Sequence, residues 1–391
     1  MIRTMNDGRF RTPSPEIRRT STVLFGSIAE LRAALAATKA GDRTFSTYGT
    51  HGTPTTAELE ALLLAGEGGA GVELSSSGLA AIATGMLAVL RSGDHLLLTD
   101  SAYGPARDFA TGMLAGLGVD VEFYDPLIGA GIASLIRPTT KLIWMESPGT
   151  HTFEVQDVPA IVAAARGAGH HVVTAIDNTW GSPGLLRPFD LGVDLSIVAL
   201  TKYWGGHADV LMGAAFANEA LLPAVREAAR LTGTVVSGED AFLVIRGSRT
   251  VELRIREQGA AALELAGRLA GHPRVARVLH PALPGDPGHA LFTRDFHGSS
   301  GLFSFELQRA HGSPTTQADA DAVADRLIAR GRFGLGYSWG GHESLVMPAH
   351  LASGVKRSVK QWTGGPLLRV SVGLDAVERL WDDLEAALAE G

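Results

Sequence analysis

The residue of this sequence that best suits chemistry is a lysine in apolar surroundings. Lys202 follows the apolar run 195–200 and lies among Tyr203, Trp204 and two glycines, away from any run of charges. A half-buried lysine can titrate low enough to act as a nucleophile and a base. The chain has five lysines, and the other four stand at a helix end, at the start of a strand or in a polar loop: Lys39, Lys141, Lys356 and Lys360. Lys202 is therefore the candidate nucleophile.

Polar residues also follow three other apolar runs. The sequence Ser75-Ser76-Ser77-Gly78-Leu79 opens a helical pattern, where unpaired N–H groups and the helix dipole favour an anion, and it equally suits a plain N-cap. Asp177 ends the buried run 172–176, where a charged carboxylate is costly without a cationic partner, and it also suits a turn. Glu146 follows the run 141–145. All three groups stand where a strand is expected to end.

The elements that must position these residues alternate along the chain. Short apolar runs predict strands, and amphipathic segments between them predict helices. Strands are expected at 71–74, 95–99, 119–124, 141–145, 171–176 and 195–200, and helices at 79–90, 105–116, 132–136 and 159–166. This alternation favours a mostly parallel sheet with helices on both faces, in which ligands bind beyond the carboxyl ends of the strands.

The three candidate groups at one sheet edge would suit pyridoxal phosphate. This cofactor needs a seat for its phosphate, a carboxylate for its pyridine nitrogen and an amine for its aldehyde. The helix start at Ser77, Asp177 and Lys202 offer these three groups. From spacing alone, a pyridoxal phosphate site is one interpretation of these three groups. The alternative is that they are, in turn, a plain N-cap, a turn residue and a buried lysine without a shared function.

The sequence gives less support for three other kinds of site: a dinucleotide site, a hydrolase nucleophile and a metal site. Residues 66–71 match G-x-G-x-x-G but precede a strand, whereas the dinucleotide fingerprint follows a strand and opens a helix. Ser76 lacks the flanking glycines of a hydrolase elbow, because Leu74 stands at one of those positions. Neither His342-Glu343 nor His207 with Asp209 has a third ligand at suitable spacing, so no metal site is expected.

The pattern divides the 391 residues into three parts. Residues 1–52 form an arm with one helix at 28–40, and residues 53–248 contain the alternating strands and helices. From residue 249 a smaller α+β domain is expected, with strands at 274–280, 302–307 and 367–372 and helices at 319–329 and 376–389, after a long helical region that begins beyond Asn218.

Composition excludes several classes of protein. The net charge of −7 and a pI near 6.0 give no basic surface for nucleic acid. The chain has no cysteine, which excludes disulfides, thiolate metal sites and cysteine nucleophiles. No stretch approaches ~18 consecutive apolar residues, and the first residues lack the apolar core of a signal peptide. A soluble cytoplasmic protein without a membrane partner is expected.

Five motifs resemble the Cys/Met-metabolism family of pyridoxal-phosphate enzymes, from about residue 23 to the end of the chain. They are Tyr48-Gly-Thr-His-Gly-Thr-Pro-Thr, Ser77-Gly-Leu-Ala-Ala-Ile, Asp177-Asn-Thr-Trp, Thr201-Lys-Tyr-Trp-Gly-Gly-His-Ala-Asp and Ser338-Trp-Gly-Gly-His-Glu-Ser. The resemblance implies the type I pyridoxal-phosphate fold of aspartate aminotransferase, with a mostly parallel seven-stranded sheet, helices on both faces and a smaller C-terminal α+β domain.

The resemblance also implies a role for each matching residue. Lys202 would bind the cofactor covalently and act in catalysis with Tyr103, which stacks on the cofactor ring, and Asp177 would pair with the ring nitrogen. The phosphate would take the amides of Gly78 and Leu79, Thr201, and Tyr48 from a neighbouring subunit. Arg369 would bind the substrate carboxylate, and Ser338 and Trp339 would lie over the substrate.

Two departures and one motif refine this expectation. Relatives often carry Arg where this chain has Thr50 and Ser where it has Ala199, so this chain is expected to bind the cofactor phosphate more weakly than they do. Ser338-Trp-Gly-Gly is typical of the bacterial members that act as carbon–sulfur β-lyases and cleave L-cystathionine to homocysteine, pyruvate and ammonia. A cysteine-conjugate β-lyase, a γ-lyase or a weakly active cofactor-binding regulator remain alternatives. The resemblance further implies an amino-acid thioether substrate and a homotetramer of paired dimers.

Overall fold

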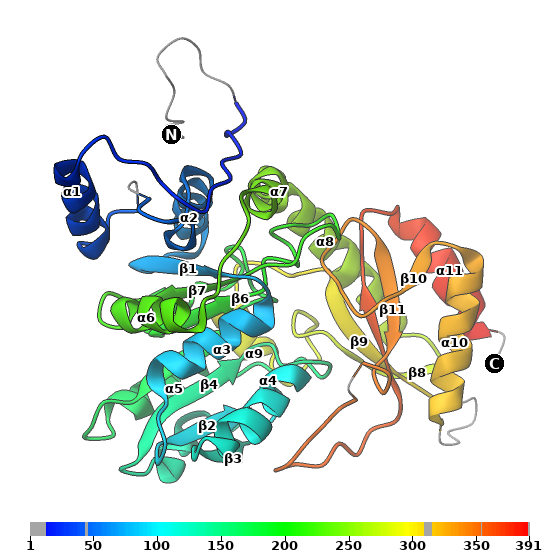
Figure 1. The fold of residues 1–391 in the computed structure, drawn as a ribbon. Coiled ribbons are helices and arrows are strands. Elements are labelled where there is room, and N and C mark those ends of the chain that lie inside the picture. The colour runs from blue at the N-terminus through cyan, green and yellow to red at the C-terminus, as the bar shows by residue number, and fades with distance from the viewer. Residues whose placement is uncertain (1–12, 44–45, 309–314, 353, 390–391) are drawn as a thin grey trace.

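The computed structural model describes residues 13–43, 46–308, 315–352 and 354–389. Its larger sheet has seven strands in the order β1-β7-β6-β5-β4-β2-β3 (Figure 1). They are β1 (Gly71–Ser75), β2 (His95–Thr99), β3 (Asp120–Tyr124), β4 (Thr140–Glu146), β5 (Val173–Asp177), β6 (Leu195–Val198) and β7 (Gly213–Ala217). Only β7 runs antiparallel to its neighbours, so the expected α/β fold with a mostly parallel sheet is confirmed.

Helices cover both faces of this sheet. One face packs against α3 (Gly78–Val89), α4 (Gly104–Asp108) and α6 (Leu222–Thr232). The other packs against α2 (Pro54–Glu67), α5 (Val158–Arg166) and α7 (Gly238–Ser248). Strands buried on both faces explain why these runs are apolar throughout instead of alternating.

A second sheet follows the long helix α8 (Val251–Ala270). Its strand order is β10-β11-β12-β9-β8, and only the pair β10 and β11 is parallel. The strands are β8 (Val275–Leu279), β9 (Leu302–Leu307), β10 (Phe333–Leu335), β11 (Ser344–Pro348) and β12 (Leu367–Ser371). Helices α10 (Gln317–Arg330) and α11 (Val377–Ala389) share a core with this sheet and α8, whereas α9 (His289–Asp295) contributes Phe292 to the core of the larger sheet.

Several elements differ from the sequence prediction. The helix expected at 105–116 is α4 followed by a π-helical segment, Phe109–Leu114, and the one expected at 132–136 is a 3-10 helix, Gly129–Leu135. The long helical region after Asn218 is three helices, because Gly233 takes a left-handed conformation at the end of α6 and Thr250 separates α7 from α8. Strands β7, β10 and β11 and helices α2 and α9 were not predicted.

The N-terminal arm holds α1 (Ile28–Lys39) and a 3-10 turn, Gly49–His51. Exposed apolar side chains of the arm include Leu24, Ile28 and Leu35. The prediction for residues 1–12 lies outside the described residues. No helix among the described residues is long and apolar enough to cross a membrane.

Candidate active site

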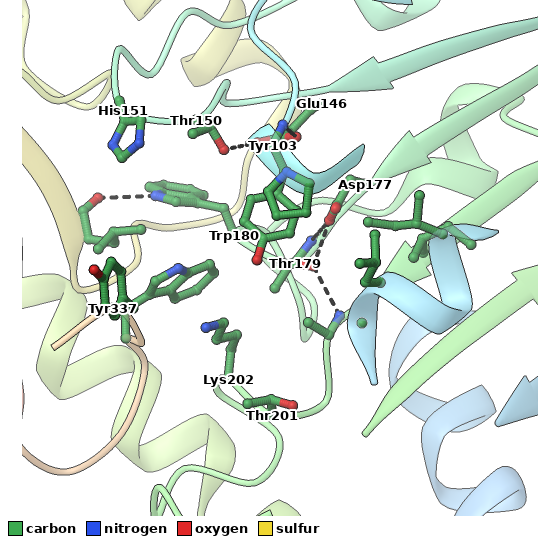
Figure 2. A pocket seen from close by; sticks show the side chains of 18 of the residues that line it. Tyr103, Glu146, Thr150, His151, Asp177, Thr179, Trp180, Thr201, Lys202 and Tyr337 are labelled. Carbon is green, nitrogen blue, oxygen red and sulfur yellow. Dashed lines mark hydrogen bonds between the residues drawn. The ribbon is translucent and has the colours of Figure 1, made fainter. Parts of the chain in front are cut away.

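A cavity of about 410 Å³ lies where the carboxyl ends of the larger sheet meet the second sheet. The segments after β1, β2, β4, β5 and β6 form one wall, and β9, β12 and the segments on either side of β11 form the other. Figure 2 shows Lys202, Asp177 and Tyr103 facing the same space. Of the residues that the sequence singled out, the cavity is lined by Gly78, Leu79, Tyr103, Asp177, Thr201, Lys202, Trp339 and Arg369.

Lys202 is partly buried, and no carboxylate among the described residues forms an ion pair with its amine. The Nζ atom lies 3.1 Å from the hydroxyl of Ser338 and 5.2 Å from the centre of a Trp339 ring. Burial and the positive charge of Arg369 lower the pKa of Lys202 from 10.5 to about 8, while Asp177 acts in the opposite direction. A substantial fraction of this amine is therefore neutral and nucleophilic near neutral pH.

Asp177 ends β5 with one oxygen bonded and the other available. Its Oδ1 accepts hydrogen bonds from the amide of Thr179 at 3.0 Å and from the Thr179 hydroxyl at 2.5 Å. No group in the described part of the chain donates to Oδ2. Burial raises the pKa of Asp177, against the bonds from Thr179 and the charge of Lys202. A cation bound at Oδ2 would favour the charged carboxylate, which is what a pyridinium nitrogen supplies.

Glu146 lies beside Asp177, because the two residues are paired in register at the ends of β4 and β5. Its Oε2 accepts the backbone N–H of Tyr103 at 2.7 Å, and its Oε1 accepts the hydroxyl of Thr150 at 2.5 Å. Burial and the nearby charge of Asp177 raise the pKa of Glu146 to about 8. The pKa of each of these two neighbouring carboxyl groups is raised, so the pair favours keeping a proton near neutral pH.

Arg369 is a buried cation whose partners are all neutral. It is the middle residue of β12, and its Nη2 donates to the carbonyls of Tyr337 at 2.8 Å and Ser338 at 3.2 Å. Within the described residues, no carboxylate makes a salt bridge with it. Burial lowers the pKa of Arg369 to about 10, so it stays charged at neutral pH. A buried guanidinium of this kind suits the carboxylate of a ligand.

The amino end of α3 offers N–H groups to the cavity. Ser77 caps the helix by accepting the N–H of Ala80 at 3.1 Å, which leaves the amides of Gly78 and Leu79 without partners among the described residues. Position 78 has to be glycine, since a Cβ there would come within 2.7 Å of the Cβ of Ala199. Unpaired amides at a helix start bind phosphate well.

The hydroxyl of Thr201, which was expected to bind the phosphate, already makes two hydrogen bonds within the protein. It accepts the N–H of Met212 at 3.0 Å and donates to the Met212 carbonyl at 3.2 Å. To donate to a phosphate, Thr201 would have to give up the bond to this carbonyl.

Two expected residues lie outside the lining of the cavity. Ser338 does not line the cavity, but its hydroxyl accepts a hydrogen bond from Lys202 and its backbone carbonyl accepts one from Arg369. Tyr48 lies on the arm with its ring against His51, and about half of it is exposed. Sequence reasoning assigned no role to several polar or aromatic residues that line the cavity, among them Glu146, Thr150, Trp180 and Tyr337. Two of these four carried a signal, since Glu146 follows a predicted strand and Trp180 ends the motif that begins at Asp177.

Comparisons with known proteins show the family of this chain. Residues 2–389 match the family described as Cys/Met metabolism PLP-dependent enzyme, and the chain belongs to this family. It is 41% identical to cystathionine beta-lyase MetC of Escherichia coli over 95% of this chain and 92% of that protein. It is 42% identical to the cystathionine beta-lyase of Bordetella avium over 95% of this chain and 90% of that protein.

A solved structure has the same fold. The cystathionine gamma synthase of Xanthomonas oryzae pv. oryzae, in complex with aminoacrylate and cysteine, superimposes with a TM-score of 0.85 at 31% identity, over 98% of this chain and 94% of that chain. Pyridoxal 5′-phosphate is therefore the cofactor of this enzyme, and the amides of α3, Asp177 and Lys202 suit its three polar ends. Within the described residues, no group of three or more acidic or histidine side chains could hold a metal ion.

Proposed function

We propose that this enzyme is a carbon–sulfur β-lyase that cleaves L-cystathionine to homocysteine, pyruvate and ammonia. The observation that carries the proposal is a buried guanidinium without a carboxylate partner, Arg369, in the same cavity as the Lys202 amine. An α-amino acid needs both groups, one for its carboxylate and one for its reacting carbon. The Escherichia coli and Bordetella avium relatives, named for their action on cystathionine, support this choice of thioether.

Arg369 would bind the substrate carboxylate. Its carbonyl partners fix one nitrogen of the guanidinium and leave the remaining donors for a two-point contact. Because the guanidinium is already desolvated, a carboxylate is the partner that compensates its charge best.

Bound pyridoxal phosphate supplies an electron sink for the negative charge that develops at Cα. The cofactor would lie with its phosphate at the amides of Gly78 and Leu79 and near Thr201. Asp177 would bind the ring nitrogen, and Tyr103 would stack on the ring.

The neutral amine of Lys202 would then remove the Cα proton. The electron pair forms the Cα–Cβ double bond, and the Cβ–S bond breaks. Lys202 returns its proton to the departing sulfur atom, so homocysteine leaves as a thiol and the amine is neutral again. The remaining three carbons react with water to give pyruvate and ammonia. Ser338 and Trp339 would hold Lys202 and cover the substrate.

We also propose that the three parts of the chain divide this work. Residues 53–248 would hold the cofactor, residues 249–391 would carry Arg369, and residues 1–52 would place Tyr48 at the phosphate of a neighbouring subunit in a homotetramer. The exposed Leu24, Ile28 and Leu35 of the arm suit such a contact. Sedimentation at assay concentration tests this, and a fully active monomer would exclude it.

The experiment that tests the function is incubation of the purified protein, loaded with cofactor, with L-cystathionine. We expect pyruvate and homocysteine. Formation of 2-oxobutanoate would instead identify a γ-lyase, and turnover of S-substituted cysteines without cleavage of cystathionine would identify a cysteine-conjugate lyase. A protein that binds the cofactor and converts none of these substrates would be a regulator. Lys202→Ala, which lacks the base, is the control and should form no keto acid.

A further inference from the structure

The connection between β11 and β12 bridges the two sheets. We call residues 354–366 the strap. Figure 1 shows this connection reaching from the second sheet toward α4, beside the larger sheet. The strap leads directly into β12, and Arg369 is the third residue of that strand.

One end of the strap is fixed on Asp100, the residue that follows β2. The carboxylate of Asp100 is fully buried and accepts the backbone N–H groups of Ser358 at 2.8 Å and Val359 at 2.8 Å. It also accepts Nη1 of Arg107 at 2.9 Å, while Nη2 of Arg107 donates to the hydroxyl of Ser358 at 2.8 Å. Burial alone would raise the pKa of Asp100, yet these bonds outweigh it and bring the pKa below its ordinary value.

A second residue of the strap binds the same edge of the larger sheet. Arg357 donates to the backbone carbonyl of Asp100 at 2.7 Å and to the carboxylate of Glu154 at 3.0 Å. Its side chain is almost fully buried, so these contacts are protected from water.

The other end of the strap is fixed on the second sheet. Arg277 of β8 lies over the ring of Trp362 at 4.4 Å, and the N–H of Gly365 donates to Glu306 of β9. The strap is thus held at both ends, on the segment after β2 at one end and on β8 and β9 at the other.

The two ends of this bridge lie close in sequence to two residues that line the cavity, Tyr103 and Arg369. Asp100 precedes Tyr103 by three residues, and the strap ends three residues before Arg369. We propose that Asp100 is a positioning residue for substrate binding, which holds Arg369 at the distance from the Lys202 side of the cavity that an α-carboxylate requires. This inference rests on the proposed role of Arg369.

The first test is Asp100→Asn in the holoenzyme. Asparagine has nearly the same shape, but it lacks the charge and offers a single acceptor oxygen to four donors, the fourth being the backbone N–H of Lys360 at 3.4 Å. We expect the Kd for L-alanine, measured from the change in visible absorbance of the holoenzyme, to rise about tenfold. The KM for L-cystathionine should rise similarly, with kcat changed less than about twofold.

Two controls separate positioning from loss of structure. Asp108→Asn removes the half-exposed contact between Asp108 and Lys356 of the same strap, 3.4 Å long, and should leave the Kd unchanged. Ethylamine is L-alanine without its carboxylate, so its binding should respond little to Asp100→Asn. An equal loss of affinity for both amines would mean that the variant disturbs the whole cavity, which would overturn the proposal.

A double-mutant cycle with Arg369→Lys gives the sharpest outcome. If Asp100 acts through Arg369, Asp100→Asn should weaken L-alanine binding by less than about twofold when Arg369 is already lysine. If the double variant instead raises the Kd for L-alanine by the product of the two single-variant factors, the two residues act independently and the proposal is overturned. If Asp100→Asn does not fold, Ser358→Ala, which removes only the hydroxyl held by Arg107, should shift the Kd in the same direction by a smaller factor, and an unchanged Kd would overturn the proposal.

The alanine measurement also separates this inference from the proposed function. A wild-type protein that binds L-alanine but does not cleave L-cystathionine would contradict the proposed reaction. The role of Asp100 would still be decided by the Kd values.

Discussion

The lowered pKa of Lys202 leads to a measurable prediction for the cofactor-free protein. Burial and the charge of Arg369 place this pKa at about 8, compared with 10.5 for an ordinary lysine. At pH 7 the neutral fraction of the amine is then roughly one in eleven, whereas an ordinary lysine would have roughly one in three thousand. The neutral, reactive form of Lys202 is therefore about 300-fold more populated at this pH than that of an ordinary lysine, and Lys202 should react faster than an equally accessible ordinary lysine.

Competitive labelling measures this directly. Trace amounts of a small amine-reactive reagent are added at a series of pH values, and the modified peptides are quantified by mass spectrometry. The chain has only four other lysines, Lys39, Lys141, Lys356 and Lys360, which act as internal standards for the amount of reagent. Labelling of Lys202 should rise with pH to a midpoint near 8 and then level off.

Two substitutions test the causes of this shift. Arg369→Met removes a positive charge but keeps a long side chain, so the midpoint for Lys202 should move to higher pH. Asp177→Asn removes the nearby negative charge and should move it to lower pH. A wild-type midpoint near 10.5, or an unchanged midpoint in Arg369→Met, would refute the view that burial and Arg369 together activate Lys202.

Three further predictions concern stability, cofactor and substrate. Burial raises the pKa of Glu67 from 4.5 to about 7, so between these pH values the folded state keeps a proton that the unfolded state has lost, and the stability of the wild type falls as the pH rises. Glutamine at this position does not titrate. The free energy of unfolding of Glu67→Gln, measured with urea, should therefore increase relative to wild type by up to about 3 kcal/mol between about pH 5 and pH 8. Thr50→Arg should tighten pyridoxal phosphate binding by roughly 1.5–3 kcal/mol in titrations of the cofactor-free protein, and equal or weaker binding would contradict the expected place of the arm. Arg369→Lys should lower kcat/KM by roughly one to several kcal/mol without loss of cofactor absorbance, because lysine cannot replace a two-point contact.

Most strands of the larger sheet could be predicted because burial on both faces makes them apolar throughout. The exception is β7, whose sequence Gly213-Ala-Ala-Phe-Ala has small residues with little strand preference of their own. It forms a strand because it lies between β1 and β6, which is a property of the assembled sheet. Similarly, the run 105–116 has helical periodicity, and nothing in that periodicity signals the π-helical segment after α4.

The part of the candidate site that could be predicted from the sequence is the part formed by residues at the ends of strands. Ser77, Asp177 and Lys202 each follow an apolar run, and the parallel sheet brings them to one edge. Arg369 came from the family resemblance alone, since its strand belongs to the second sheet. Glu146 bonds to Tyr103 of the segment after β2 and to Thr150 of a loop in which His151 has a φ of 66°, and no sequence pattern predicted either contact. Tyr48 stays a prediction because its proposed partner belongs to another subunit.

The charges of the cavity explain why the fold keeps a costly arrangement at this edge. Among the described residues, Arg369 has only carbonyl partners, Lys202 donates to a hydroxyl, and the first amides of α3 have no partner. Against these groups stand the carboxyl groups of Asp177 and Glu146, and burial raises the pKa of both, which reduces the negative charge that they offer. A cavity formed by packing alone would pair or exclude such buried cations. Under the proposed function their excess would be balanced by two anions, a phosphate at the start of α3 and a carboxylate at Arg369, so the ligand-free cavity would already be organised for both ligands.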